Sequence, residues 1–275
     1  MRSHEVEELM TTAEYQTIRL TREGDVAVVC LNRPEVHNAF NAGMIGELTE
    51  AFLALAATED VRTIVLRGEG RSFCAGADAV WMRESLELSQ EENEEDALRM
   101  SDMFGAIDGA PQAVVCRAHG AALGGGMGLL AVCDIVVAAG NTRFGFTETR
   151  LGIIPAVISR FVVPKIGPSW ARRLFLTGER FDAERAREIG LVHEVLEEEK
   201  LDQAVAELAE AVRCAGPRAV CEAKRLIADL LSADGPERRE LTARRIAAVR
   251  TSPEGQEGLR AFLEKRAPGW KPERG

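Results

Sequence analysis

Short apolar runs rich in β-branched residues alternate with stretches of helical spacing through the first half of the chain. Val26–Leu31 is one such run and predicts a buried strand that ends at residues 32–34. In residues 44–57 the apolar positions recur at helical spacing instead. Further strands are predicted at residues 63–67, 113–117, 134–138 and 143–145. Strands separated by helices in this way predict right-handed crossovers, and therefore an α/β fold with a largely parallel sheet.

The pattern becomes helical from about Gly167 onward. Helices are predicted at residues 170–177, 182–189, 199–214, 217–231, 236–250 and 254–266. Because this half offers no sheet of its own, we expect it to pack on the first half or on a neighbouring subunit. Residues 83–103 are strongly acidic and polar on most faces, which predicts a solvated helix over a cleft.

Composition excludes several classes of partner. The 275 residues carry 34 basic and 44 acidic side chains, so the net charge is −10. Nucleic acids and anionic membrane surfaces both require a basic face, and we expect neither as a partner. Residues 1–14 form a polar, acidic segment without the apolar core of a signal peptide. No apolar run approaches the ~18–20 residues that a membrane span requires.

The six cysteines form no CxxC pair and lie near no histidine cluster. Most of them fall in apolar stretches, which is typical of buried free thiols in a reducing compartment, and we therefore predict a cytoplasmic protein. Cys74 lies in a glycine-bearing loop and is the one cysteine that we also weigh as a nucleophile. The sequence offers it no recognisable histidine partner.

Two loops hold glycines in positions suited to binding a ligand through the backbone. Residues 72–78 follow a predicted strand, and Asp78 is placed to cap the helix that comes next. Residues 120–128 hold a cluster of glycines directly before an apolar helix, whose free N–H groups and dipole suit an oxyanion. The spacing fits neither a dinucleotide fingerprint nor a Walker loop. Taken singly, each loop also fits ordinary tight packing.

Glu148 is the third candidate for chemistry. It stands between a short predicted strand and a Gly/Pro turn, among apolar and β-branched neighbours. A carboxyl group in an apolar pocket has a raised pKa and suits proton transfer near neutral pH. The alternative is a surface glutamate that pairs with Arg143 or Arg150.

In their order and spacing, these pieces resemble the crotonase (enoyl-CoA hydratase/isomerase) superfamily from about Tyr15 to Trp270. The motifs that carry the resemblance are residues 31–35 with Asn38 and Ala39, 75–78, 122–126 with 133–135, 144–155, and 261–266. The resemblance implies a spiral of repeated ββα units over residues 15–210 and a helical trimerisation region over residues 211–275. It also implies homotrimers or hexamers, with no metal and no cofactor besides the CoA moiety of the substrate.

The resemblance further implies where the thioester binds. The N–H groups of Ala77 and Gly125 would form the oxyanion hole, and Glu148 would be the acid/base. The adenine would lie against the backbone near Ala75 and Ala77, while Phe262 and Lys265 would reach the adenine or phosphates from a neighbouring subunit. The other expected substrate contacts are Gly76, Asp78, Trp81, Gly124 and Gly128.

One position departs from the family pattern. Typical hydratases carry a first glutamate where this chain has Gly128, which cannot transfer a proton. Three hypotheses follow. The enzyme could be an isomerase that uses a single glutamate, or Glu148 and a bound water could perform hydration alone or with the help of a substrate group. Alternatively, the space freed at Gly128 could admit a branched or carboxylated acyl chain.

Residues 78–82, 127–129, 147–152, 155–159 and 161–163 look most like bacterial methylglutaconyl-CoA hydratases, a group that also tolerates glycine at this place. We therefore predict a hydratase that acts on a short, branched 2-enoyl-CoA, carboxylated or not, such as 3-methylglutaconyl-CoA. Arg150, Arg160 or His119 would pair with a substrate carboxylate. The rivals are a Δ3,Δ2-enoyl-CoA isomerase that uses Glu148 alone and a catalytically silent homologue that binds CoA esters.

Overall fold

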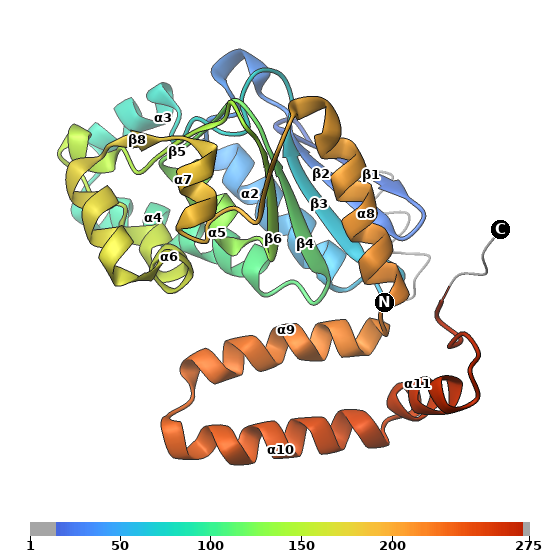
Figure 1. Cartoon of the computed structure of the whole chain (residues 1–275). Coiled ribbons are helices and arrows are strands. Elements are labelled where there is room, and N and C mark those ends of the chain that lie inside the picture. Colours follow the sequence, from blue (N-terminus) through green and yellow to red (C-terminus); the bar gives the residue numbers. More distant parts are fainter. Residues whose placement is uncertain (1–14, 272–275) are drawn as a thin grey trace.

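A six-stranded sheet in the order β1-β2-β3-β4-β6-β9 runs through the middle of the molecule (Figure 1). The computed structural model describes residues 15–271, so the polar segment at residues 1–14 lies outside the described residues. The strands of this sheet are β1 Ile18–Glu23, β2 Val26–Leu31, β3 Thr63–Gly68, β4 Ala113–Ala118, β6 Ile135–Ala139 and β9 Glu194–Leu196. β1 pairs with β2 in antiparallel fashion and all later neighbours are parallel, which confirms the predicted α/β fold.

Both faces of the parallel strands are covered, which explains their continuous apolar runs. Ile64 and Leu66 of β3 face the main core, whereas Val65 faces a smaller core on the opposite side. Helix α8, Leu201–Cys214, closes the smaller core with Leu201 and Val205 (Figure 1). The other face is covered by α2 Ala42–Ala56, α4 Gln90–Asp108, α5 Gly125–Val132 and α6 Ala156–Thr177.

A second, three-stranded sheet holds the two glycine-bearing loops in place. Its order is β5-β7-β8, with β5 Ala121–Leu123, β7 Arg143–Gly145 and β8 Arg180–Phe181. The short helices that complete the core are α3 Ala79–Glu84, α7 Ala183–Glu188, and the 3₁₀ helices Pro34–Val36, Ser85–Glu87, Glu148–Leu151 and Glu198–Lys200. Helix α6 kinks at Gly167, where the backbone is not helical (φ 74°, ψ 156°), between Pro164 and Pro168.

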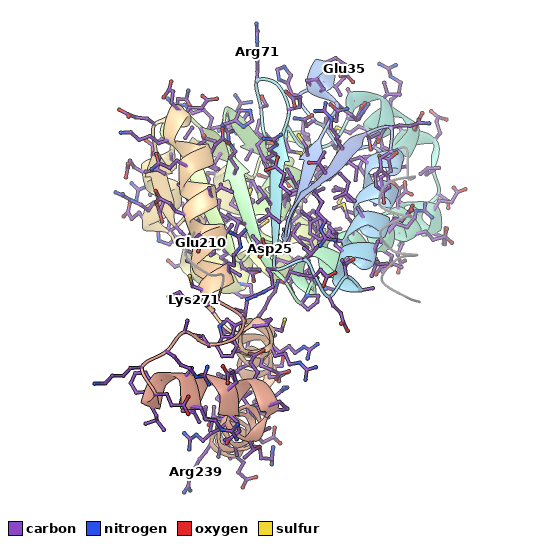
Figure 2. All side chains as sticks on the ribbon, turned by 90° about the vertical axis from the view of Figure 1, so that its right-hand side faces the viewer. Asp25, Glu35, Arg71, Glu210, Arg239 and Lys271 are labelled. Carbon is purple, nitrogen blue, oxygen red and sulfur yellow. The ribbon has the colours of Figure 1, made fainter. Side chains whose placement is uncertain are left out.

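Three C-terminal helices form an arm that projects from the core (Figure 1). They are α9 Pro217–Ser232, α10 Gly235–Thr251 and α11 Pro253–Leu263. Figure 2 shows the arm extending away from the sheet, with Arg239 at the end of the molecule opposite Arg71. Within this chain α9 and α10 bury none of their residues, and large apolar side chains such as Phe262 stay exposed. A role of the arm in trimerisation remains a prediction.

The predicted strands are confirmed to within a residue or so, and three expectations are corrected. The region after Gly167 is not purely helical, because β8 and β9 add strands to both sheets. The first half of α6 was not predicted at all, and the acidic segment at residues 83–103 is not one helix. It divides at the 3₁₀ turn Ser85–Glu87, and α4 restarts with a capping box between Ser89 and Glu92. No helix within residues 15–271 combines the length and apolar character needed to cross a membrane.

Candidate active site

A cavity of about 410 Å³ lies between the two glycine-bearing loops, helix α4 and the start of α6. Ala75, Gly76, Ala77 and Trp81 line it from the first loop and α3, and Gly124 and Gly125 line it from the second loop. Glu148 lines the same cavity from the 3₁₀ helix that follows β7. The structure therefore brings together residues that were predicted separately from distant parts of the sequence.

The Ala77 N–H is presented by a short parallel bridge to Phe40. The Phe40 N–H donates to the Gly76 carbonyl at 2.7 Å, and the Asp78 N–H donates to the Phe40 carbonyl at 2.8 Å. In a parallel bridge of this kind, the residue between the two bonded positions points its own N–H away from the partner strand. Within the described residues the Ala77 N–H has no acceptor, so it is available to a ligand in the cavity.

Asp78 supports this loop from the side. Its carboxylate accepts the Val80 N–H at 2.7 Å, which caps α3, and pairs with the Arg33 guanidinium at 2.7 Å. Burial alone would raise the pKa of Asp78, but the hydrogen bond from Val80 and the nearby Arg33 lower it overall. The side chain is thus bound within the chain and does not line the described cavity. In the described chain Asp78 supports the Ala77 loop, and its predicted contact with substrate stays a prediction.

The Gly125 N–H stands at the first residue of α5, where a helix has no internal acceptor. Gly124 before it adopts φ 50° and ψ −119°, a conformation that favours glycine and turns the chain into the helix. A side chain at Gly125 would meet the Phe40 ring at 2.9 Å. Among the described residues no acceptor bonds the Gly125 N–H, which leaves it free beside the cavity.

Backbone hydrogen bonds fix the two loops side by side. The Cys74 N–H donates to the Ala121 carbonyl at 3.0 Å, and the Leu123 N–H donates to the Cys74 carbonyl at 3.0 Å. The two free N–H groups therefore belong to segments that cannot shift independently. This is the arrangement that an oxyanion site requires, because donors fixed in advance need no reorganisation when charge develops.

The Glu148 carboxyl group lies beside this pair of loops. Its Oε1 is 3.5 Å from the position that a Cβ on Gly124 would take, and its Oε2 is buried without a hydrogen-bond partner among the described residues. Burial raises the pKa of Glu148, as predicted. Neither Arg143 nor Arg150 forms an ion pair with it within residues 15–271. The arrangement is that of a proton-transfer group, and the surface ion pair weighed from the sequence is not observed.

Gly128 does not free space for the acyl chain, and that hypothesis is wrong. A Cβ atom at Gly128 would lie 2.4 Å from Ile158 Cγ2 and 2.6 Å from Phe104 Cζ. Both side chains are buried, and Gly128 is not among the residues that line the described cavity. Phe104 and Ile158 thus fill the region where a first glutamate would project, and Gly128 contacts protein instead of substrate.

None of the three candidates for a carboxylate partner lines the cavity in the described chain, so their pairing with a substrate stays a prediction without structural support. His119 is buried with Nε2 2.8 Å from the Gly70 carbonyl oxygen. Arg160 lies over the Phe161 ring at 4.4 Å, and the Arg150 side chain runs beside Gly178. Phe262 and Lys265 do not line the cavity of their own chain either. Their reach toward a neighbouring subunit stays a prediction.

Several lining residues were not predicted. Apolar side chains make up most of the remaining lining: Met82, Met100, Leu151, Ile153, Ile154, Pro155, Val157 and Ile158. Asn93 and Asp96 of α4 add polar groups, as do Ser85 and Thr147, and Asp96 pairs with Arg99. The acidic run on α4 was a signal that this helix borders a cleft, but only the fold shows which of its residues face inward.

The described structure gives little support to Cys74 as a nucleophile or to a metal site. Cys74 is fully buried, and burial raises the pKa of its thiol to about 12, so a thiolate nucleophile is disfavoured. Within residues 15–271 no cluster of three or more His, Cys, Asp or Glu side chains is placed to ligate a metal ion.

Comparisons with known proteins agree with this geometry. Residues 21–273 match the family model described as enoyl-CoA hydratase/isomerase. The crotonyl-CoA hydratase of Syntrophomonas wolfei is 32% identical over 254 residues, which covers 92% of this chain and 96% of that protein. The crystal structure of an enoyl-CoA hydratase from Shewanella pealeana superposes with a TM-score of 0.90 at 34% identity, covering 98% and 100% of the two chains. Pseudomonas aeruginosa AtuE gives a TM-score of 0.90 at 37% identity, covering 94% and 100%.

Proposed function

The chain is an enzyme that belongs to the enoyl-CoA hydratase/isomerase family and has the crotonase fold, and we propose that it adds water to a short, branched 2-enoyl-CoA. The observation that carries this proposal is the meeting in one cavity of two free N–H groups, at Ala77 and Gly125, with the half-buried Glu148, whose Oε2 has no partner among the described residues.

The proposed reaction uses Glu148 first as a base and then as an acid, and the two N–H groups as oxyanion donors. Glu148 accepts a proton from water as the water oxygen bonds to C3, and the C2=C3 electrons move toward the thioester oxygen. The N–H groups of Ala77 and Gly125 bind the enolate oxygen, and losing one such donor typically costs ~3–4 kcal/mol of barrier. The protonated Glu148 then delivers a proton to C2, which completes the addition and restores the carboxylate.

The rest of the cavity lining supports an uncharged acyl group. It is mainly apolar, and Asp96 is its one carboxyl group among the described lining residues besides Glu148 at the thioester end. A 3-methylglutaconyl group would bring a second carboxylate, yet none of the described lining residues is Lys, Arg or His. Since a carboxylate without a basic partner is costly to bury, we favour an uncharged branched enoyl-CoA over 3-methylglutaconyl-CoA.

Isomerisation is the second candidate, and the filled space at Gly128 favours it. Phe104 and Ile158 occupy the place of a second glutamate, and Asp96, the other carboxyl group among the described lining residues, pairs with Arg99, so Glu148 is left as the proton carrier. One carboxylate can move a proton from C4 to C2 of a 3-enoyl-CoA through the same enolate. Such an enzyme would need no activated water.

Turnover of four thioesters separates these functions. We expect water addition to crotonyl-CoA and 3-methylcrotonyl-CoA, with little reaction of 3-methylglutaconyl-CoA or of a 3-enoyl-CoA. Glu148→Gln should lower kcat by about 10²–10⁴-fold while CoA-ester binding is unchanged, and Glu198→Gln on an exposed 3₁₀ helix is the matched control. Double-bond migration without hydration would identify an isomerase, and binding without turnover a silent homologue. Undiminished hydration by the Glu148 variant would overturn the mechanism.

We also propose the setting in which the enzyme works. The exposed apolar side chains of the arm, such as Ile227, Leu231 and Phe262, support assembly into a homotrimer or a hexamer. Cys30, Cys74, Cys116 and Cys133 are buried free thiols, which fits a reducing compartment and the predicted cytoplasmic location. The reaction as written consumes only water and the acyl-CoA and calls on no further cofactor.

A further inference from the structure

The end of α5 opposite Gly125 is held by a lysine from another helix. Residues 126–132 of α5 are buried, and at Cys133 the backbone turns extended without a backbone N–H to cap the helix. The last carbonyl groups of such a helix need donors from elsewhere. Lys165 of α6 supplies them, because its Nζ donates to the carbonyl oxygens of Leu130 at 3.2 Å, Ala131 at 3.3 Å and Cys133 at 2.5 Å.

We propose that Lys165 is a positioning residue for the oxyanion site. Its ammonium group fixes the C-terminal end of α5 and offsets the negative end of the helix dipole, so that the Gly125 N–H presents a more positive potential to the thioester oxygen. The inference rests on the proposed function in one respect, namely that Gly125 binds that oxygen.

The composition of α5 allows the charge of Lys165 to influence the potential at the Gly125 N–H. From Gly125 to Val132 it holds only glycine and apolar residues, so no charge along the helix competes with the one at its end. Eight residues at a rise of 1.5 Å separate the two ends by about 12 Å. At such a distance a charge in the protein interior still acts on the far end, because little water lies between to screen it.

No carboxylate pairs directly with Lys165 within residues 15–271. The nearby Asp134 accepts hydrogen bonds from Lys224 at 2.7 Å and from the Val114 N–H at 2.7 Å. Burial lowers the pKa of Lys165, while Cys133, Asp134, Cys116 and Asp108 act in the opposite direction. The hydrogen-bond partners of its ammonium group in the described chain are therefore the helix carbonyls alone.

Three substitutions separate charge from hydrogen bonding. Lys165→Met removes both, Lys165→Gln keeps an N–H donor without the charge, and Lys165→Arg keeps the charge. Lys200→Met, at an exposed lysine, is the control for losing a lysine elsewhere. In an otherwise wild-type chain we expect the Met and Gln variants to lower kcat about tenfold with KM within twofold, and the Arg variant to stay near wild type.

The decisive readout is the infrared carbonyl band of ¹³C-labelled crotonyl-CoA bound to each Lys165 variant in a Glu148→Gln background, where the thioester persists. Binding should lower the carbonyl frequency when position 165 carries lysine or the Lys165→Arg substitution, and the lowering should shrink in the Met and Gln variants. A Gln variant with the wild-type band and kcat would overturn the inference, and would leave the proposed function intact. No frequency change with Lys165 in place would overturn both. If the Met variant does not fold, the comparison of Gln with Arg decides alone.

Discussion

The two ends of the cavity are built from different parts of the chain. At the end that we propose for the thioester, the lining presents the backbone N–H groups of Ala77 and Gly125, on loops held by the Phe40–Ala77 and Cys74–Ala122 bridges. At the end that we propose for the acyl chain, it presents side chains, and Leu151, Ile153 and Ile154 are more than half exposed. Backbone geometry survives most substitutions, whereas a side-chain lining changes with each one. We therefore expect the chemistry to depend on the first end and the choice of acyl group on the second.

The largest predicted effect is at the thioester end. In Gly125→Ala the new methyl group would meet the Phe40 ring at 2.9 Å, so the start of α5 must move away from the Ala77 loop. Losing one oxyanion donor in this way should lower kcat by about 10²–10³-fold, measured by steady-state hydration of crotonyl-CoA.

Gly46→Ala is the matched control, because this glycine is exposed in helix α2 and a Cβ there meets nothing within 4 Å. It should leave kcat unchanged and stabilise the fold by roughly 0.5–1 kcal/mol. A Gly125→Ala enzyme with normal kcat would mean that the backbone at this end is not what binds the thioester.

The next prediction tests the filled space at Gly128. Gly128→Glu would drive a carboxyl group against Ile158 and Phe104, and we expect the free energy of unfolding to fall by about 2–4 kcal/mol in urea titrations. Hydration should not improve. A variant that folds with wild-type stability and gains hydratase activity would show that this region can admit a second glutamate after all.

Much of the thioester end could be predicted from the sequence, because its signals are local. Glycine clusters after strands, Asp78 before a helix and a glutamate among apolar residues each show in a few adjacent positions. The same holds for strands such as β3 and β4, whose apolar runs are buried on both faces. Short edge strands lack such a run: β9 spans three residues, which pair with β6 and of which two are apolar.

The acyl end and Gly128 could not be predicted in the same way. Which side chains occupy the space around Gly128 depends on how α4 and α6 pack against α5, and these helices lie tens of residues apart. A glycine in place of a glutamate suggested free space, but Phe104 and Ile158 had already filled it. Arg150, Arg160 and His119 are likewise absent from the described lining, because tertiary packing sets the partners of their side chains.

A smaller effect is expected from charge at the acyl end. Asp96→Asn removes a carboxylate from the lining and frees Arg99, so it should raise kcat/KM for 3-methylglutaconyl-CoA relative to 3-methylcrotonyl-CoA by about three- to tenfold. Asp102→Asn, on the same helix but outside the cavity lining, is the control and should leave the ratio unchanged. An unchanged ratio in both variants would argue that acyl charge is selected elsewhere.

The smallest predicted effect concerns the free energy of unfolding, which the Glu148 carboxylate lowers near neutral pH. Burial raises the pKa of Glu148, so the carboxylate form is disfavoured in the folded chain. Below the ordinary pKa of a glutamate the group is protonated in both states, and Glu148→Gln should match the wild type. As pH rises through the window between the unfolded and the raised folded pKa, the unfolded chain loses its proton first and the wild type loses stability. Near neutral pH the variant should therefore be more stable by about 1 kcal/mol in denaturant titrations.

The exposed Glu198→Gln should show no such pH-dependent gain. If the difference in stability between Glu148→Gln and the wild type is the same at neutral pH as at pH 4, the wild-type Glu148 carboxylate is solvated in the folded state. The thioester end would then lack the desolvated carboxyl group that we assign to proton transfer.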